Sequence, residues 1–192
     1  MILSNIEIQK ALDDGRLVID PEPNPRVATV EQDSPFNTSS VDLRLGSFLS
    51  IPQAGSFNYD LRGGKIAQFL SSISKTVDIS QSEYLLAPNT FVLGKTLEKI
   101  KLPLDCKEPL AARIEGKSSF ARCGLLVHFT APTVHAGFEG TLTLEMINLG
   151  NTKITLYSGM AICQLVFETV YGEIQPNPSQ FQNQTTPAGN KE

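Results

Sequence analysis

The chain has 192 residues, of which 41% are hydrophobic and 19% charged, and its net charge is −4. This length is enough for one domain with its own core, and the composition is typical of a soluble globular protein. An acidic chain without a dense run of Lys and Arg is poorly suited to neutralising phosphates of DNA or RNA, so we expect no nucleic-acid partner. No apolar run approaches the roughly 18 residues that span a bilayer, and the N-terminus lacks the features of a signal peptide, so we expect a cytoplasmic protein without membrane contact.

The cysteines argue against both disulfides and zinc. Cys106, Cys123 and Cys163 are far apart and odd in number, which favours free thiols in a reducing compartment. With no C-x-x-C pair and two histidines, the chain is poorly equipped for a structural zinc site.

The first predicted element is a short N-terminal helix. Ser4 and Glu7 form an S-x-x-E capping box, and Ile8 and Leu12 repeat at helical spacing. Gly15 is placed to end this helix in a left-handed conformation.

Most of the remaining chain is predicted to form strands. Alternating apolar residues or short apolar runs cover residues 16–20, 39–51, 83–103, 108–116, 124–131, 140–148, 152–158 and 160–174. Residues 52–64 and 70–83 are rich in Gly and Ser, and we expect loops there. Many short strands with one clear helix predict a mainly β fold, a sandwich or barrel. We expect one β domain over residues 1–178 and a tail over residues 179–192.

Polar residues gather around a possible short helix that Ser118 would cap and Gly124 would end. The side chains concerned are those of Lys117, Ser118, Ser119 and Arg122. Backbone N–H groups at such a start, with a lysine and two hydroxyls, would form a cradle for an anion. A P-loop is excluded because the required earlier glycine is replaced by Ala111. The alternative is that these residues simply face solvent.

Glu145 lies in a predicted strand whose two faces differ. Leu142, Leu144 and Met146 point to one face, and Thr141, Thr143 and Glu145 to the other. Glu145 is therefore either a solvated surface carboxylate or a general acid/base in a pocket beside that face. The strand pattern leaves both interpretations open.

Two histidines sit in the same region. His135 lies in a turn between strands, where a histidine is usually solvated, and His128 alternates with apolar residues as a hydrogen-bonded strand residue would. The H-x-E and P-C-x-x-C signature of zinc-dependent nucleobase deaminases is missing. Pattern alone therefore indicates a β domain with an anion pocket.

Four blocks of sequence resemble one family. They are S-S-V-D-L-R-L-G at 39–46, G-K-S-S-F-A-R-x-G-L-L-V-H at 116–128, A-G-F-E-G-T-L-T-L-E-M-x-N at 136–148 and G-M-A-I-C-Q-L-x-F-E at 159–168. Together they closely resemble the dCTP deaminases of the trimeric dUTPase-like superfamily. The likeness runs, with gaps in the loops, from Met1 to about Gln184.

The resemblance implies a distorted β-barrel or jelly roll assembled as a homotrimer with active sites at subunit interfaces. It implies deamination of dCTP to dUTP and ammonia without zinc, Mg²⁺ accompanying only the triphosphate. The dUTP would supply dTMP synthesis, and dTTP would be a feedback inhibitor.

The resemblance also implies roles for individual residues. Glu145 falls on the catalytic glutamate, and Ser118 and Arg122 fall on residues that support the glutamate and the attacking water. Ala131 falls where a backbone carbonyl helps to place that water, and Thr143 would line the base and sugar pocket. Lys117 and Ser119 should contact phosphates, and Gln180, Phe181 and Gln184 match a tail motif, K-Y-x-x-Q, that covers the nucleotide.

Three positions depart from the family pattern. Gln180 replaces a lysine, Lys117 replaces an arginine, and His135 replaces an aspartate. In dUTPases and bifunctional relatives that aspartate helps to activate the water that cleaves the triphosphate, so His135 favours a monofunctional deaminase, although histidine can also act as a base. The alternatives are a bifunctional enzyme yielding dUMP, a dUTPase, and a non-catalytic nucleotide-binding trimer. Retention of Ser118, Arg122 and Glu145 argues against the last.

Overall fold

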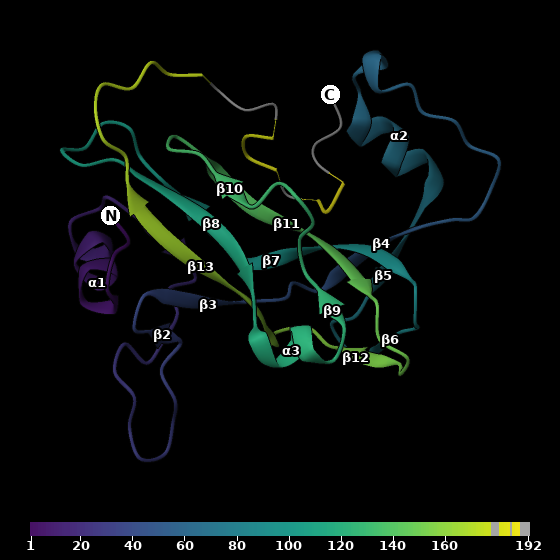
Figure 1. Ribbon diagram of the computed structural model, residues 1–192, viewed down its shortest axis with the longest axis horizontal. Coiled ribbons are helices and arrows are strands. Elements are labelled where there is room, and N and C mark those ends of the chain that lie inside the picture. Colours follow the sequence, from purple (N-terminus) through teal and green to yellow (C-terminus); the bar gives the residue numbers. More distant parts are fainter. Residues whose placement is uncertain (178–180, 185, 189–192) are drawn as a thin grey trace.

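The protein is described from a computed structural model that places residues 1–177, 181–184 and 186–188. Its helical elements are α1 (Asn5–Asp13), a 3-10 turn (Leu61–Gly63), α2 (Ile66–Ile73) and α3 (Ser118–Arg122). The strands are β1 (Val18–Asp20), β2 (Phe36–Asn37), β3 (Ser40–Arg44), β4 (Phe48–Pro52), β5 (Ser74–Asp78), β6 (Tyr84–Leu86), β7 (Phe91–Lys101), β8 (Leu110–Gly116), β9 (Leu125–Leu126), β10 (Thr133–Val134), β11 (Glu139–Asn148), β12 (Ile154–Leu156) and β13 (Ala161–Thr169). Figure 1 shows α1 and α2 at opposite ends of the strands.

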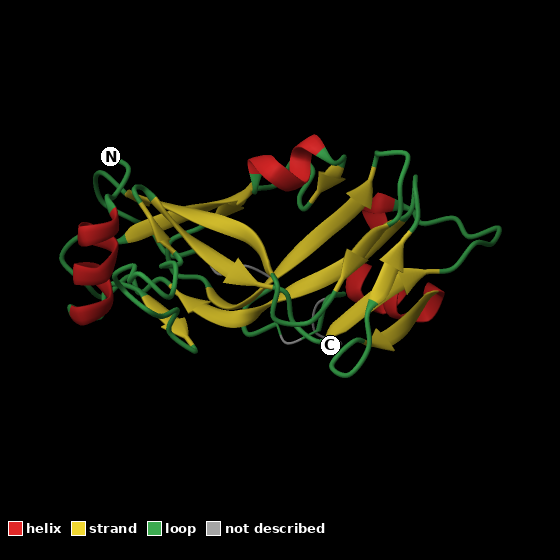
Figure 2. Cartoon of the chain, turned by 90° about the horizontal axis from the view of Figure 1, so that it is seen from below, coloured by secondary structure: helices red, strands yellow, loops and turns green. Residues whose placement is uncertain are grey.

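Two antiparallel sheets dominate the described part of the chain. One has six strands in the order β5-β4-β7-β11-β9, with β1 also paired to β7, and the other has the order β10-β8-β13-β3-β2. β6 and β12 form a separate pair. Figure 2 shows the strands in side view. The predicted mainly β class is confirmed, although no pairing between described strands closes the sheets into a barrel.

One hydrophobic core joins the sheets. The alternation expected for β11 is confirmed, because Leu142, Leu144 and Met146 are buried while the residues between them are partly exposed. Phe167 on β13 is also fully buried. The face of β11 that carries Glu145 is thereby left on the outer side of the core.

The predicted N-terminal helix is confirmed as α1. Ser4 Oγ accepts a hydrogen bond from the Glu7 N–H at 3.3 Å, and Ile8 is completely buried. Gly15 has φ +70° and donates to the Leu12 carbonyl at 3.2 Å, so it ends the helix as expected. No helix in the described ranges has the length and apolarity to cross a membrane.

The predictions for residues 70–83 and for the start of α3 need correction. Residues 70–83 include the end of α2 and the whole of β5, where a loop was expected. Ile66, Leu70 and Ile73 have helical spacing, and β5 is stabilised by its pairing with β4, which no local pattern reveals. Ser118 is the first residue of α3 rather than its cap, and the capping residue makes no side-chain hydrogen bond.

Candidate active site

A cavity of about 1080 Å³ lies over the outer face of the larger sheet. Its floor is formed by β7 and β11, and its walls by residues 129–138, by α2 and by described residues of the C-terminal segment. Figure 1 shows α2 and this segment on the same side of β7 and β11. The cavity therefore depends on segments that are far apart in sequence.

Glu145 lies on the floor of the cavity. It is half-buried on β11 opposite Leu93 of β7, and its Oε2 accepts a hydrogen bond from the Phe129 N–H at 3.1 Å. Among the described residues, one backbone N–H holds the carboxylate and no Lys, Arg or His forms an ion pair with it. The strand pattern left open whether Glu145 faces solvent or a pocket. The structure places it on the floor of a pocket.

A bulge in β7 fixes the floor beside Glu145. Pairing shifts between Thr141 and Thr143, opposite residues 95–99 of β7. There the Thr96 hydroxyl accepts from the Leu142 N–H at 2.9 Å and donates to the Glu98 carbonyl at 2.7 Å. This side chain replaces ladder hydrogen bonds that the bulge would otherwise leave unmade.

Glu98 supports the same bulge from the interior. Its carboxylate is 0% exposed and accepts from the Arg44 Nε at 2.7 Å and from the Arg44 N–H at 2.9 Å. The Arg44 side chain is 41% exposed, so its guanidinium stays in contact with solvent while it compensates a carboxylate that would be costly to bury unpaired. No sequence motif marks Thr96 or Glu98, since their role comes from cross-strand contacts.

One end of the cavity is apolar. Phe91 and Phe129 are tilted by 49° with ring centroids 5.8 Å apart, and Leu93 lies beside them on the floor. α2 contributes Ile66 and Leu70 to this end. A flat aromatic ring would fit against such a surface, with Glu145 at its edge.

The other end is polar. Ala131, His135 and Thr143 all line the cavity, and His135 is exposed in the turn between β10 and β11, as predicted. The Thr143 hydroxyl donates to the Pro187 carbonyl at 3.3 Å. These residues come together with Glu145 within a single chain.

The described part of the tail is bound to the edge of this cavity. Gln184 is 6% exposed, and its Nε2 donates to the Thr141 carbonyl at 2.7 Å. Gln182, which the sequence analysis did not select, accepts from the Glu139 N–H at 2.8 Å and donates to the Gly137 carbonyl at 2.7 Å. Phe181 also lines the cavity. Gln180 lies outside the described residues.

The predicted anion cradle on α3 does not reach this cavity. Ser118, Ser119 and Arg122 are exposed, and the Lys117 ammonium forms an ion pair with Asp42 on β3. In Figures 1 and 2 alike, α3 lies on the opposite side of the molecule from the tail. Within a single copy of the chain, these four residues therefore lie away from the cavity that holds Glu145.

The cavity carries little positive charge of its own. Among the described residues that line it there is neither lysine nor arginine, and His135 and Glu145 are the ionisable ones. A phosphate chain bound here would need cations from residues outside this lining.

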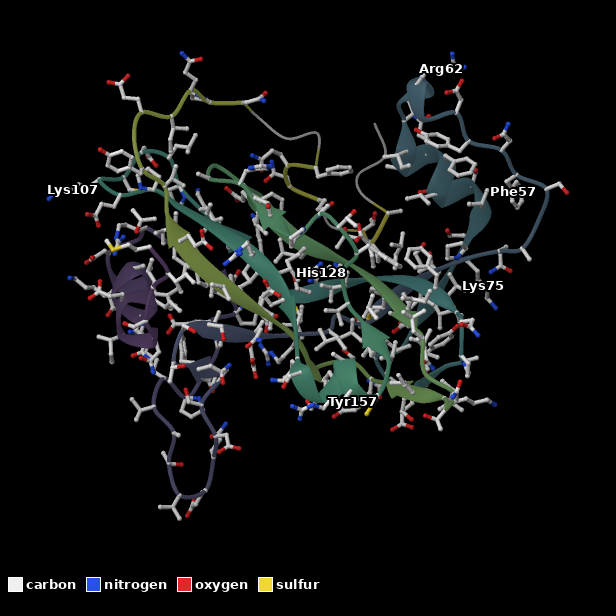
Figure 3. The ribbon with its side chains drawn as sticks, in the orientation of Figure 1. Phe57, Arg62, Lys75, Lys107, His128 and Tyr157 are labelled. Carbon is white, nitrogen blue, oxygen red and sulfur yellow. The ribbon has the colours of Figure 1, made fainter. Side chains whose placement is uncertain are left out.

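The other histidine and the cysteines have no visible role in this site. His128 lies beyond the end of β9, so its expected place in a strand is wrong, and its buried Nδ1 makes no hydrogen bond with any described residue. It lies near the centre of the view in Figure 3. The three cysteines are free, as expected, and burial raises the pKa of the Cys163 thiol. Across the described residues, no three His, Cys, Asp or Glu side chains gather as metal ligands.

Comparison with known proteins agrees with this fold. A family model described as dCTP deaminase-like matches residues 2–170. The chain is 37% identical to a "dCTP deaminase, dUMP-forming" of Methanosphaera stadtmanae, over 99% of this chain and 93% of that one. It is 34% identical to a "dCTP deaminase" of Rhodospirillum rubrum, over 88% and 83%.

A solved structure shares the fold. The 2'-deoxycytidine 5'-triphosphate deaminase of Agrobacterium tumefaciens superposes with a TM-score of 0.61 at 23% identity, covering 86% of this chain and 47% of that one. The present chain thus spans about half the length of that protein. A mainly β domain with a carboxylate-bearing pocket is the class that the structure defines. The family match then places the chain in the dCTP deaminase-like family.

Proposed function

We propose that the protein is an enzyme that deaminates dCTP hydrolytically, giving dUTP and ammonia. The observation that carries this proposal is the position of Glu145, whose carboxylate lies at the edge of an apolar surface and is oriented by the Phe129 N–H. The names of relatives that match most of the chain support the substrate.

Glu145 would act as general acid and base. Its carboxylate takes a proton from water, and the hydroxide adds to C4 of the cytosine ring while N3 receives a proton. The amino group then takes a proton and leaves as ammonia, which gives the uracil ring. A positioned carboxylate typically contributes about 10²–10⁴-fold to such steps.

A second copy of the chain would complete the site. We propose a homotrimer in which α3 of one subunit faces the cavity of the next, bringing Ser118 and Arg122 to the water and Glu145. Lys117 and Ser119 would then reach the phosphates. The support is that α3 is exposed and remote from its own cavity, which lacks lysine and arginine among its described lining residues.

The polar residues of the cavity would orient substrate and water. The Ala131 carbonyl would hold the attacking water, Thr143 would contact base or sugar, and His135 would face the phosphates. The tail, with Gln180, Phe181 and Gln184, would close over the nucleotide, and excluding bulk water would strengthen each polar contact. This arrangement fits tail residues that are already bound to β11.

We propose that Mg²⁺ enters with the triphosphate and neutralises part of its charge, that the reaction needs no zinc, and that the enzyme works in the cytoplasm. The dUTP would feed dTMP synthesis. dTTP, another pyrimidine deoxynucleoside triphosphate, would compete for the same cavity as a feedback inhibitor.

A second candidate function is deamination followed by cleavage to dUMP. The relative from Methanosphaera stadtmanae is named dUMP-forming, whereas the one from Rhodospirillum rubrum is not. His135 lies in the cavity, and an imidazole is able to activate water. We favour dUTP as the product because His135 stands where the resemblance implies an aspartate. A dUTPase without deaminase activity is disfavoured, since it has no use for Glu145 at the base.

The test is a product assay with purified protein, dCTP and Mg²⁺, measuring ammonia and separating the nucleotides. The wild type should release ammonia with dUTP, and Glu145→Gln should lose at least about 100-fold in rate while still binding dCTP. The matched control is Glu168→Gln, whose carboxylate is paired with Arg113 at 2.6 Å outside the cavity lining. Appreciable turnover by Glu145→Gln would overturn the mechanism, dUMP would select the second candidate, and dCTP binding without ammonia would favour a nucleotide-binding trimer.

A further inference from the structure

A lysine lies on the cavity face of β7, one position beyond the residues that line the cavity. Phe91 and Leu93 line it, and alternate residues of a strand share a face, so Lys95 points to the same side. The residue between Leu93 and Lys95 confirms the alternation, because a Cβ on Gly94 would lie 2.6 Å from the Met146 Cε in the core.

The register with β11 places Lys95 beside the polar end of the cavity. Lys95 is directly opposite Thr143, and Leu93 is opposite Glu145. Directly opposed residues have Cβ atoms roughly 5 Å apart. Two residues along a strand advance the chain by roughly 7 Å, so Lys95 lies about that far along β7 from Leu93, on the side of Thr143.

The lysine is partly withdrawn from water. Its backbone carbonyl accepts from the Gly46 N–H at 2.8 Å, and its stem passes Gly46, where a Cβ would lie 3.4 Å from the Lys95 Cγ. Burial lowers the pKa of the Lys95 ammonium. A cation that has lost part of its hydration gains more from an anionic ligand than a fully solvated one does.

We propose that Lys95 binds the phosphate chain of the nucleotide from β7, one position beyond the part of that strand that forms the floor of the pocket. The inference rests on the proposed function, which supplies the nucleotide. The described lining of the cavity has neither lysine nor arginine. With Lys95, the same chain would supply a cation beside the polar end of its own cavity. The contact adds to those of α3 from a second subunit and needs no change in the sheet.

The experiment compares binding of dCTP and of inorganic tripolyphosphate by calorimetry. The proteins are the wild type, Lys95→Met, Lys95→Gln, Lys95→Arg and the control Lys107→Met, and thermal unfolding checks that each is folded. Lys107 is exposed at the edge of the molecule in Figure 3. Losing one charge-assisted hydrogen bond should weaken both ligands by about tenfold in the Met and Gln variants. The Arg variant should retain most of the affinity, and Lys107→Met should match the wild type.

Two results would overturn the proposal. Unchanged affinity in the folded Met and Gln variants would exclude a contact, and weaker dCTP binding with unchanged tripolyphosphate binding would place Lys95 at the base or sugar. Failure of the proposed function would look different. If the protein binds tripolyphosphate through Lys95 but releases no ammonia from dCTP, the Lys95 contact stands and the proposed deaminase activity is wrong.

Discussion

Glu145 and Glu98 sit on neighbouring strands in opposite settings. Glu98 faces the interior, is completely buried and is held by two donors of Arg44. Glu145 faces the cavity and is held by one backbone N–H. The buried carboxylate is fixed in an ion pair and serves the sheet, whereas the other faces a cavity, as the proposed proton transfer requires.

Glu139 leads to a pH-dependent prediction. Its carboxylate lies 2.5 Å from the Lys99 ammonium and 3.3 Å from that of Lys101, and these hydrogen bonds, Lys99 first, hold the pKa of Glu139 below its usual value. A depressed folded-state pKa stabilises the protein above the unfolded pKa, and this contribution is lost as the pH falls through the folded value. Glu139→Gln should therefore lower the free energy of unfolding at neutral pH.

Urea unfolding of wild type and Glu139→Gln between pH 7 and acid pH checks this prediction. The difference should be constant near neutrality and shrink below about pH 4, where the unfolded carboxylate is protonated. Partial exposure of the group keeps the effect small. A difference that stays constant down to acid pH would remove the ion pairs as its cause.

At the scale of elements, the sequence pattern predicted the helices and strands whose character depends on their own residue spacing. α1 and the two faces of β11 follow from spacing alone, and both were found as expected. β5 depends on pairing with β4, and α2 has no buried residue, so its apolar face belongs to the cavity rather than to a core. These elements gain their stability from partners that a sequence window does not contain.

For the candidate site too, the sequence predicted which residues share a strand face but not which residues of different elements come together. Thr143 and Glu145 were placed on one face of a strand, and the structure confirms that face as the floor of a cavity. Lys95 carried a usable signal, since it alternates with Phe91 and Leu93, but its relation to Thr143 needs the register of two strands. The separation of α3 from Glu145 follows from the tertiary fold alone.

The tail should contribute directly to nucleotide binding. Removing residues 179–192 deletes the hydrogen bonds of Gln182 and Gln184 to the β11 edge, each contributing about 1 kcal/mol net. We expect KM for dCTP to rise and kcat to fall. Gln184→Ala should reproduce part of the loss. Asn183→Gly, which removes an exposed side chain and tolerates the left-handed backbone at φ +56°, should not. Steady-state kinetics decide, and unchanged constants in the truncated protein would remove the tail from the mechanism.

At the scale of the whole molecule, the residues of the proposed active site lie on two separate sides of one copy. One side carries the cavity with Glu145, and the other carries α3 with Ser118, Ser119 and Arg122 exposed. Within one copy, none of these α3 residues lines the cavity, so the proposed chemistry would need both halves to be brought together by a second copy. A ring of three copies, each presenting α3 to the next cavity, would pair every half-site once.

The most direct test mixes two inactive proteins, Glu145→Gln and Arg122→Gln, and measures ammonia released from dCTP after subunits have exchanged. A site composed of Glu145 from one copy and Arg122 from the next should regain up to about a quarter of wild-type activity at equal mixing, because each intact half has an even chance of being present. Mixtures that stay as inactive as the separate variants, although subunit exchange is demonstrated, would contradict a shared active site and with it the account of how this pocket works.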